Sequence, residues 1–169
     1  MELNLIAFTD RGYALAQKLA EALGGKAVRG GKAVGLNEWT EAHFSGDALV
    51  FVGAAGIAVR AIAPYVKRKT VDPAVVVVDE NARYAIPILS GHLGGANRLA
   101  RAIASLTGAQ AVITTATDGR NLFAADVWAK GLGLRVMNAR AIKTVSAALL
   151  AGETLLYWSR WPIPGTPPK

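Results

Sequence analysis

The sequence predicts an α/β fold with three layers, in which helices cover both faces of an open, mostly parallel sheet of the Rossmann-like or flavodoxin-like kind. Three observations lead to this prediction. Strand-like and helix-like segments alternate along the 169 residues, the most β-branched runs are short and wholly apolar, and hydrophobic residues make up 52% of the chain. Such alternation favours parallel strands joined by helices that pack on the sheet, and such runs are typical of strands buried on both faces.

The first fifty residues begin the alternation. Residues 3–8 form a short apolar run that predicts a strand, and the apolar positions of residues 11–23 recur at helical spacing until two glycines end the helix. Residues 26–35 are rich in glycine and carry only short strand-like pieces. One or two helical turns are expected over residues 37–44, and residues 48–52 predict a buried strand.

The middle of the chain continues the pattern. Residues 57–66 predict a helix in spite of a proline near its end, and residues 74–78 are the most β-branched run and predict a central strand. Residues 81–83 are typical of a turn that leads into a further strand over residues 84–89. Residues 96–106 then predict an amphipathic helix that a glycine ends.

Shorter elements are expected in the last part of the chain. Strands are predicted over residues 111–115, 134–137 and 154–158 from their apolar and β-branched composition. Helices are predicted between them, over residues 124–131 and 141–150, and a glycine ends the second.

The charge of the chain favours a polyanionic partner. The formal net charge is +7 and the pI is about 10.0, and such a field attracts phosphates, polycarboxylates and nucleic acids. The basic residues are scattered apart from Lys67, Arg68 and Lys69, and aromatic residues make up only 7%, which is too few for base-stacking platforms. A small polyanion therefore fits better than nucleic acid. A basic surface kept for solubility is the alternative that charge alone leaves open.

Two absences narrow the class of protein further. The chain has no cysteine, which excludes disulfides, thiolate metal sites and thiol nucleophiles. No apolar run reaches the roughly 18 residues of a membrane-spanning helix, and Glu2 stands where a secretory signal carries basic residues. We therefore expect a cytoplasmic protein that does not bind membranes.

In open α/β sheets ligands bind beyond the carboxyl ends of the strands, so we expect three strand-to-helix turns to meet at one rim and form a site. The first turn carries Gly53 and Gly56, which let backbone N–H groups approach an anion at a helix N-terminus. Arg60 follows one helical turn later and can form a fork-like pair with a carboxylate or phosphate. The pattern is not a nucleotide-binding fingerprint. Alternatively, the glycines only form the turn and Arg60 is solvated.

The second turn is the richest in chemistry. Its residues of interest are Ser90, Gly91, His92, Gly94, Gly95 and Asn97. A neutral imidazole can act as a base or as a metal ligand, and Ser90 or Asn97 can orient it or a bound ligand. The alternative is a buried or capping histidine in a tight turn.

The third turn places Thr114, Thr115, Thr117 and Asp118 directly after a predicted strand. Three hydroxyls and a carboxylate can hold acidic groups of a ligand or polarise a water. Alternatively, Thr117 and Asp118 are ordinary cap and turn residues. Asp118 can equally be the partner of His92. We assign no metal ligand.

Four motifs in these regions resemble those of one family. They are GAAGIAVRAIAP at residues 53–64, KTVDPAVVVVD at residues 69–79, IPILSGHLGGAN at residues 86–97 and VITTATD at residues 112–118. In this order they resemble the CbiG family of cobalamin-biosynthesis proteins, and SGHLGGAN is the most diagnostic. The resemblance is strong over residues 48–120, and residues 122–158 resemble the start of the family's middle region.

The resemblance implies a domain organisation. Residues 1–120 are expected to form the family's N-terminal α/β domain, and residues 121–160 the start of its middle region, packed on the same sheet. The proline-rich residues 161–169 cannot join a sheet or helix interior and form a tail. Full-length members continue into a C-terminal domain that nothing here matches.

The resemblance also implies an activity. Family members are cobalt-precorrin-5A hydrolases of anaerobic cobalamin synthesis, which open a δ-lactone on a cobalt-bound tetrapyrrole and release acetaldehyde. The substrate is a polyanion that carries its own cobalt, so no further cofactor is expected. The implied partners are this substrate, a separate chain with the C-terminal domain, and further copies of the chain.

The same resemblance implies roles for the residues of the three turns. His92 is the general base, oriented by Asp118 or Ser90. The N–H groups of Gly94 and Gly95 stabilise the oxyanion, and Arg60 holds a peripheral carboxylate. Alternatively, His92 ligates the cobalt of the substrate.

Two other functions stay open. One is a non-catalytic corrinoid-binding module that works with a missing C-terminal domain or partner chain. The other is a nucleotide- or phosphate-binding Rossmann-like domain, against which the missing glycine-rich fingerprint counts.

Overall fold

The computed structural model describes residues 2–46, 48–68, 71–92, 94–119, 122–156, 158–160 and 162. The chain divides into two compact units, residues 1–113 and 114–169. The sequence prediction had set a boundary after residue 120. The expectation that the later region packs on the same sheet stays a prediction.

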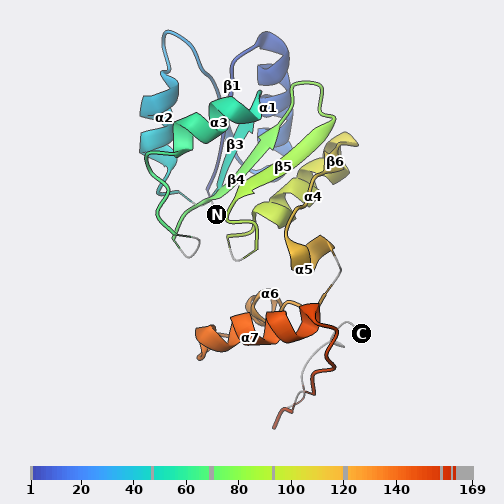
Figure 1. Cartoon of the computed structure of the whole chain (residues 1–169). Coiled ribbons are helices and arrows are strands. Elements are labelled where there is room, and N and C mark those ends of the chain that lie inside the picture. Colours follow the sequence, from blue (N-terminus) through green and yellow to red (C-terminus); the bar gives the residue numbers. More distant parts are fainter. Residues whose placement is uncertain are drawn as a thin grey trace. The chain divides into compact units, whose positions relative to one another are not determined.

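A six-stranded sheet forms the first unit (Figure 1). Its strands are β1 (Leu3–Ala7), β2 (Lys26–Arg29), β3 (Ala48–Val52), β4 (Ala74–Val78), β5 (Tyr84–Leu89) and β6 (Gln110–Ala111). Their order is β2-β1-β3-β4-β5-β6. Every neighbouring pair is parallel except β4 and β5, which are antiparallel. The prediction of a mostly parallel α/β sheet is therefore confirmed.

Four helices cover the two faces of this sheet (Figure 1). They are α1 (Asp10–Leu23), α2 (Leu36–His43), α3 (Ala55–Ile62) and α4 (Ala96–Thr107). One core cluster joins α1 and α4 to strand residues such as Val50 and Val76. A second cluster joins α2 and α3 to Phe51 and Val77, the next residues along the same strands. Because successive strand residues point to opposite faces, the apolar runs of β3 and β4 serve both clusters, and the predicted three layers are confirmed.

The ends of the helices follow from local sequence. The side chain of Thr9 accepts a hydrogen bond from the N–H of Gly12 at the start of α1, and Gly24 ends that helix in the left-handed region with φ 72°. Helix α3 ends at Ile62 rather than at residue 66 as predicted. Pro64 accounts for the difference, since it lacks an N–H group and restricts the residue before it.

The reversal of β5 has a local cause. Only five residues separate β4 from β5, whereas a parallel pair needs a crossover of a dozen or more residues. Asp79 closes the turn: its carboxylate accepts hydrogen bonds from the N–H groups of Asn81, Arg83 and Tyr84, at 3.1, 2.8 and 2.7 Å. The sheet therefore has a carboxyl edge, where β1 to β4 end, and an amino edge, where they begin and where β5 ends.

The second unit is helical in the part that the structure describes. It contains α5 (Ala116–Gly119), α6 (Ala125–Gly131) and α7 (Ala139–Leu150). The strands predicted over residues 134–137 and 154–158 are wrong, because residues 134–137, 154–156 and 158 are not in strands and residue 157 lies outside the description. The strand predicted over residues 111–115 ends at Ala111. Of the proline-rich tail, only Pro162 is described.

No helix in the described ranges has the length and apolar character needed to cross a membrane. Helix α1, the longest of them, has 14 residues and shows its polar side to solvent.

Candidate functional site

The structure separates two of the three predicted turns. Gly53 follows β3 at the carboxyl edge, whereas Ser90 follows β5 at the amino edge. A five-residue strand such as β3 spans roughly 16 Å, so the two turns lie a strand length apart. The prediction that the turns share one rim is wrong, because β5 runs antiparallel to β4.

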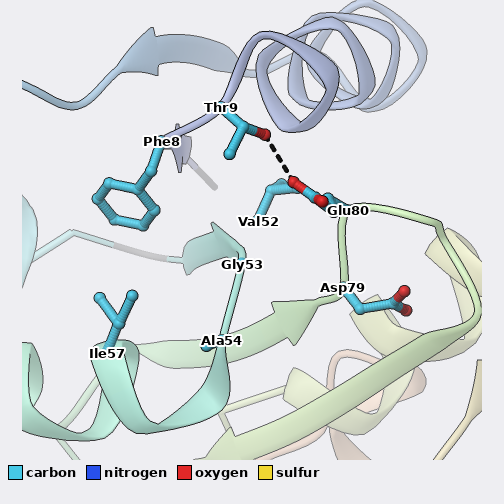
Figure 2. A pocket seen from close by; sticks show the side chains of 8 residues that line it. All are labelled: Phe8, Thr9, Val52, Gly53, Ala54, Ile57, Asp79 and Glu80. Atoms are coloured by element: carbon cyan, nitrogen blue, oxygen red, sulfur yellow. Dashed lines mark hydrogen bonds between the residues drawn. The ribbon is translucent and has the colours of Figure 1, made fainter.

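A pocket of about 280 Å³ opens at the carboxyl edge (Figure 2). Its lining residues come from the ends of β1, β3 and β4 and the start of α3: Phe8, Thr9, Val52, Gly53, Ala54, Ile57, Asp79 and Glu80. Gly53 is the predicted site residue among them. The turn after β1, which carries Thr9, was only a weaker candidate from the sequence. Glu80 was not predicted as a site residue, although it closely follows β4 and ligands bind at strand carboxyl ends.

The aromatic wall of this pocket is held by two glycines. A Cβ at Gly30 would lie 3.0 Å from two ring carbons of Phe8, and one at Gly53 would lie 3.3 Å from another. Gly30 and Gly53 follow β2 and β3, the strands on either side of β1, which ends before Phe8. The ring therefore lies between two stretches of backbone that leave it little freedom.

The polar end of the pocket is a hydrogen bond between side chains. The hydroxyl of Thr9 donates to Oε2 of Glu80 at 2.7 Å and accepts from the N–H of Gly12 at 3.0 Å. Asp79 also lines the pocket, but its carboxylate already accepts three backbone hydrogen bonds in the β4–β5 turn. Glu80 is therefore the carboxylate that a ligand meets here.

Gly56 and Arg60 lie together on α3. The Nη1 of Arg60 donates to the carbonyl oxygen of Gly56 at 3.3 Å, and a Cβ at Gly56 would lie 3.4 Å from that nitrogen. The guanidinium thus folds back along the exposed side of the helix, over the space that Gly56 leaves. Neither residue lines the pocket, and a role for Arg60 in ligand binding stays a prediction.

At the amino edge, the glycines of the second turn are needed by the turn itself. A Cβ at Gly91 would lie 2.7 Å from Oδ1 of Asn97, which is buried, and one at Gly94 would lie 2.7 Å from the carbonyl oxygen of Ser90. Ser90 has φ 53°, a region that residues with side chains rarely adopt. Tight closure of the loop is a sufficient reason for Gly91 and Gly94.

This loop also caps α4. The N–H of Gly95 donates to the carbonyl oxygen of His92 at 3.2 Å, and the N–H of Asn97 donates to that of Gly91 at 2.9 Å. The expectation that the N–H of Gly95 stabilises an oxyanion is therefore not supported, because that group already has a partner. The same role for Gly94 stays a prediction. The imidazole of His92 stands on this loop and is partly exposed.

A second loop is tied to the first at the same edge. The hydroxyl of Ser90 donates to the carbonyl oxygen of Asp72 at 2.9 Å. The carboxylate of Asp72 is buried and accepts from the N–H of Lys67, at 3.1 Å to each oxygen. Ser90 and Asp72 therefore hold the Lys67 loop beside the His92 loop.

Three exposed cations flank these two loops. They are Lys67, Arg68 and Arg98. The Nη2 of Arg98 lies 3.8 Å from the place of a Cβ at Gly95, so its guanidinium covers the end of the His92 loop. Within the described ranges, none of the three forms an ion pair. Lys67 and Arg68 were noted as a cluster from the sequence, but Arg98 was not. Its position in the first turn of α4, directly after the His92 loop, was the signal that could have identified it.

The third turn belongs to the second unit. Thr114 is exposed, and the hydroxyl of Thr115 donates to Oδ2 of Asp118 at 2.7 Å. The side chain of Thr117 lies outside the description. The expectation that Asp118 orients the imidazole of His92 stays a prediction. Among the described side chains, no group of three or more histidines, aspartates and glutamates is placed to hold a metal ion.

Comparison with known proteins finds relatives named for cobalamin biosynthesis or its cobalt-precorrin intermediate, both by sequence and by structure. A cobalt-precorrin-5A hydrolase of Salmonella typhimurium is 42% identical over 168 residues, which covers 91% of this chain and 47% of that protein. Another from Priestia megaterium is 40% identical over 107 residues, covering 63% of this chain and 29% of that protein. The structure of a cobalamin biosynthesis protein G homolog from Sulfolobus solfataricus matches with a TM-score of 0.56 and 25% identity, over 95% of this chain and 51% of that one.

Two family descriptions match consecutive parts of the chain. Cobalamin synthesis G N-terminal matches residues 38–118, and the cobalamin biosynthesis central region matches residues 123–169. The chain spans about half the length of its Salmonella relative, and the matched part of the chain covers under a third of the Priestia one. By these matches the chain belongs to the CbiG family of cobalamin-biosynthesis proteins, of which it holds N-terminal and central regions.

Proposed function

We propose that this chain takes part in cobalamin biosynthesis by binding cobalt-precorrin-5A and opening its δ-lactone, with release of acetaldehyde. The names and identities of the relatives support this reaction. Cobalt enters with the substrate, and the chain needs no metal of its own. The composition that predicts a cytoplasmic protein agrees with a biosynthetic role.

The amino edge is the substrate site in this proposal. The observation that carries the assignment is that three exposed cations lie on and beside the two tied loops without an ion pair among the described residues. Lys67 and Arg68 stand on the loop that Asp72 and Ser90 tie to the His92 loop, and Arg98 lies by Gly95 at the end of the latter. A tetrapyrrole with several acetate and propionate groups is a flat polyanion, and an open edge with spaced cations suits it. The pocket at the carboxyl edge suits it less well, because Glu80 would repel a carboxylate.

His92 acts as the base in this site. In the first step it takes a proton from water as the oxygen adds to the lactone carbonyl. The ring C–O bond then breaks, and the protonated imidazole returns its proton to the leaving oxygen, which leaves a carboxylic acid, a hydroxyl group and a neutral base. In the second step the base takes the hydroxyl proton. The C–C bond then breaks, acetaldehyde leaves, and the electron pair stays on a macrocycle carbon that is protonated in turn.

Ser90 supports this base by position. Its hydroxyl donates to the carbonyl oxygen of Asp72, so it fixes the loop that carries His92 rather than moving protons. Axial ligation of the substrate's cobalt is the alternative role of His92.

A second candidate function is a non-catalytic corrinoid-binding module. A hydrogen bond at the proposed site favours it, because the N–H of Gly95, one of the two expected oxyanion donors, is already bonded to the carbonyl oxygen of His92. In this case a separate chain, or further copies of this one, supplies the groups that complete the site.

Incubation of the chain with cobalt-precorrin-5A separates the two functions. Acetaldehyde supports the hydrolase, whereas binding without acetaldehyde supports the module. The absence of both, with the full-length Salmonella relative active in parallel, contradicts the proposal. His92→Ala is expected to abolish release of acetaldehyde, with His43→Ala on α2 as the matched control. A change in the cobalt absorption spectrum on binding that His92→Ala removes would instead indicate ligation.

Charge reversal tests the location of the site. Lys67→Glu, Arg68→Glu and Arg98→Glu are each expected to weaken substrate binding by about tenfold, the value of one charged hydrogen bond. The weakening should shrink at high salt because the cations are exposed. Lys18→Glu on α1 is the matched control, and equal losses in all four variants would place the substrate elsewhere.

A further inference from the structure

We propose that the pocket at the carboxyl edge is a second binding site, which takes a small, mostly apolar molecule carrying one hydrogen-bond donor. The pocket lies where β1, β3 and β4 end, the place at which open α/β sheets usually bind ligands. It is separated by the length of the strands from the edge that carries His92. Its chemistry also differs from that edge.

The shape of the pocket sets the size of its ligand. A dry protein cavity of about 150 Å³ is large enough for benzene, and this pocket measures about 280 Å³. A single ring with a short substituent therefore fits. The ring of Phe8 and the side chain of Ile57 line the pocket on its apolar side, away from Thr9 and Glu80 (Figure 2).

The walls are formed before any ligand arrives. Phe8 is held between Gly30 and Gly53, and Val52 is almost fully buried at the end of β3. Ala54 stands at the start of α3. A preformed apolar wall lowers the cost of ordering on binding.

The polar end of the pocket selects for a donor. Oε2 of Glu80 accepts the hydroxyl hydrogen of Thr9, which is itself held by the N–H of Gly12. Within the described residues, Glu80 has no ion pair, and Thr9 is its hydrogen-bond partner. The carboxylate of Asp79 points away from Phe8 and Ile57 (Figure 2). A ligand thus meets one carboxylate whose oxygens can accept further hydrogen bonds. This favours a hydroxyl or ammonium group in the ligand and disfavours an acidic group.

A titration with three ring compounds tests this site on the full 169-residue chain. Benzyl alcohol, benzylamine and benzoate share one ring and differ in the polar group. In amide NMR spectra the first two are expected to give saturable shifts at Gly53, Ala54 and Glu80, and benzoate is expected to give none. Absence of saturable shifts with all three, or equal affinity for benzoate, overturns the proposal.

Two pairs of variants complete the test. Ala54→Leu adds bulk to an exposed lining position and is expected to lower affinity for benzyl alcohol at least tenfold, while Ala63→Leu at the other end of α3 leaves it unchanged. Glu80→Gln is expected to lower the affinity for benzylamine by about tenfold, which corresponds to the loss of one charged hydrogen bond. Glu21→Gln on α1 is its control. If Ala54→Leu binds benzyl alcohol, and Glu80→Gln binds benzylamine, as tightly as their control variants do, the proposed site is wrong.

Discussion

At the scale of single residues, Gly94 has no room for a side chain. A Cβ there would overlap the Cβ of Ser90 and lie 2.7 Å from its carbonyl oxygen. We expect Gly94→Ala to lower the free energy of unfolding by about 1–3 kcal/mol, the usual cost of forcing atoms into a packed position. Urea denaturation, monitored by circular dichroism, measures this change in the free energy of unfolding.

Gly56→Ala is the matched control for this variant. A Cβ at Gly56 meets only the far end of Arg60, at 3.4 Å, and alanine is favoured over glycine inside a helix by up to about 1 kcal/mol. Gly56→Ala is therefore expected to be neutral or stabilising. Equal destabilisation in the two variants would show that the contact with Ser90 is not the cause.

The glycines also show how far residue-level prediction reaches. The density of glycine around His92 marked the loop as unusual, and that observation needed only the sequence. The reason for Gly91 and Gly94 lies in contacts with Asn97 and Ser90, which depend on how the loop folds over the start of α4. Composition alone does not separate close approach of a ligand from close approach of the chain's own atoms.

At the scale of elements, Thr9 links α1 to the β4–β5 turn. Its hydroxyl caps α1 through Gly12 and donates to Glu80. Thr9→Val keeps the shape and removes both hydrogen bonds, so we expect a loss of about 1–2 kcal/mol in the free energy of unfolding. Thr9→Ser keeps the hydroxyl and is expected to retain most of the stability. If Thr9→Val unfolds at the same urea concentration as Thr9→Ser, the cap contributes nothing.

The bounds of the strands were easier to predict from the sequence than their directions. The bounds of β3, β4 and β5 agree with the sequence prediction, because short buried runs of β-branched residues are distinctive. The direction of β5 was wrongly implied by the alternation of strands and helices. The five-residue connection after β4 was the signal that the strand turns back, and this reversal divides the predicted site between two edges.

The failed strands of the second unit have a different cause. The runs at residues 134–137 and 154–158 have the apolar composition of strands, but a strand forms only where another strand accepts its backbone hydrogen bonds. No strand is found in the described residues of this unit. Met137 and Leu156 are accordingly exposed, at 87% and 96%.

At the scale of the whole molecule, the hydrophobic core belongs to the first unit. The largest fully buried side chains run from Leu5 to Ile103 in the sequence, and both core clusters lie within residues 3–113. In the described part of the second unit, only Asp126 and Ala129 are buried. The pocket and the three cations of the amino edge belong to the first unit as well.

This distribution predicts that residues 1–113 fold alone. Both faces of the sheet keep their helices in this fragment, so its urea unfolding is expected to be cooperative, with a free energy of about 5–15 kcal/mol. Amide NMR spectra of the fragment should keep the dispersion of the sheet residues. The matched fragment 114–169 lacks buried large side chains in its described part, and is expected to give no cooperative transition, because too little apolar surface is removed from water to offset the lost chain entropy. A fragment 1–113 that unfolds gradually, or needs the second fragment in order to fold, would show that the sheet depends on residues beyond Ile113.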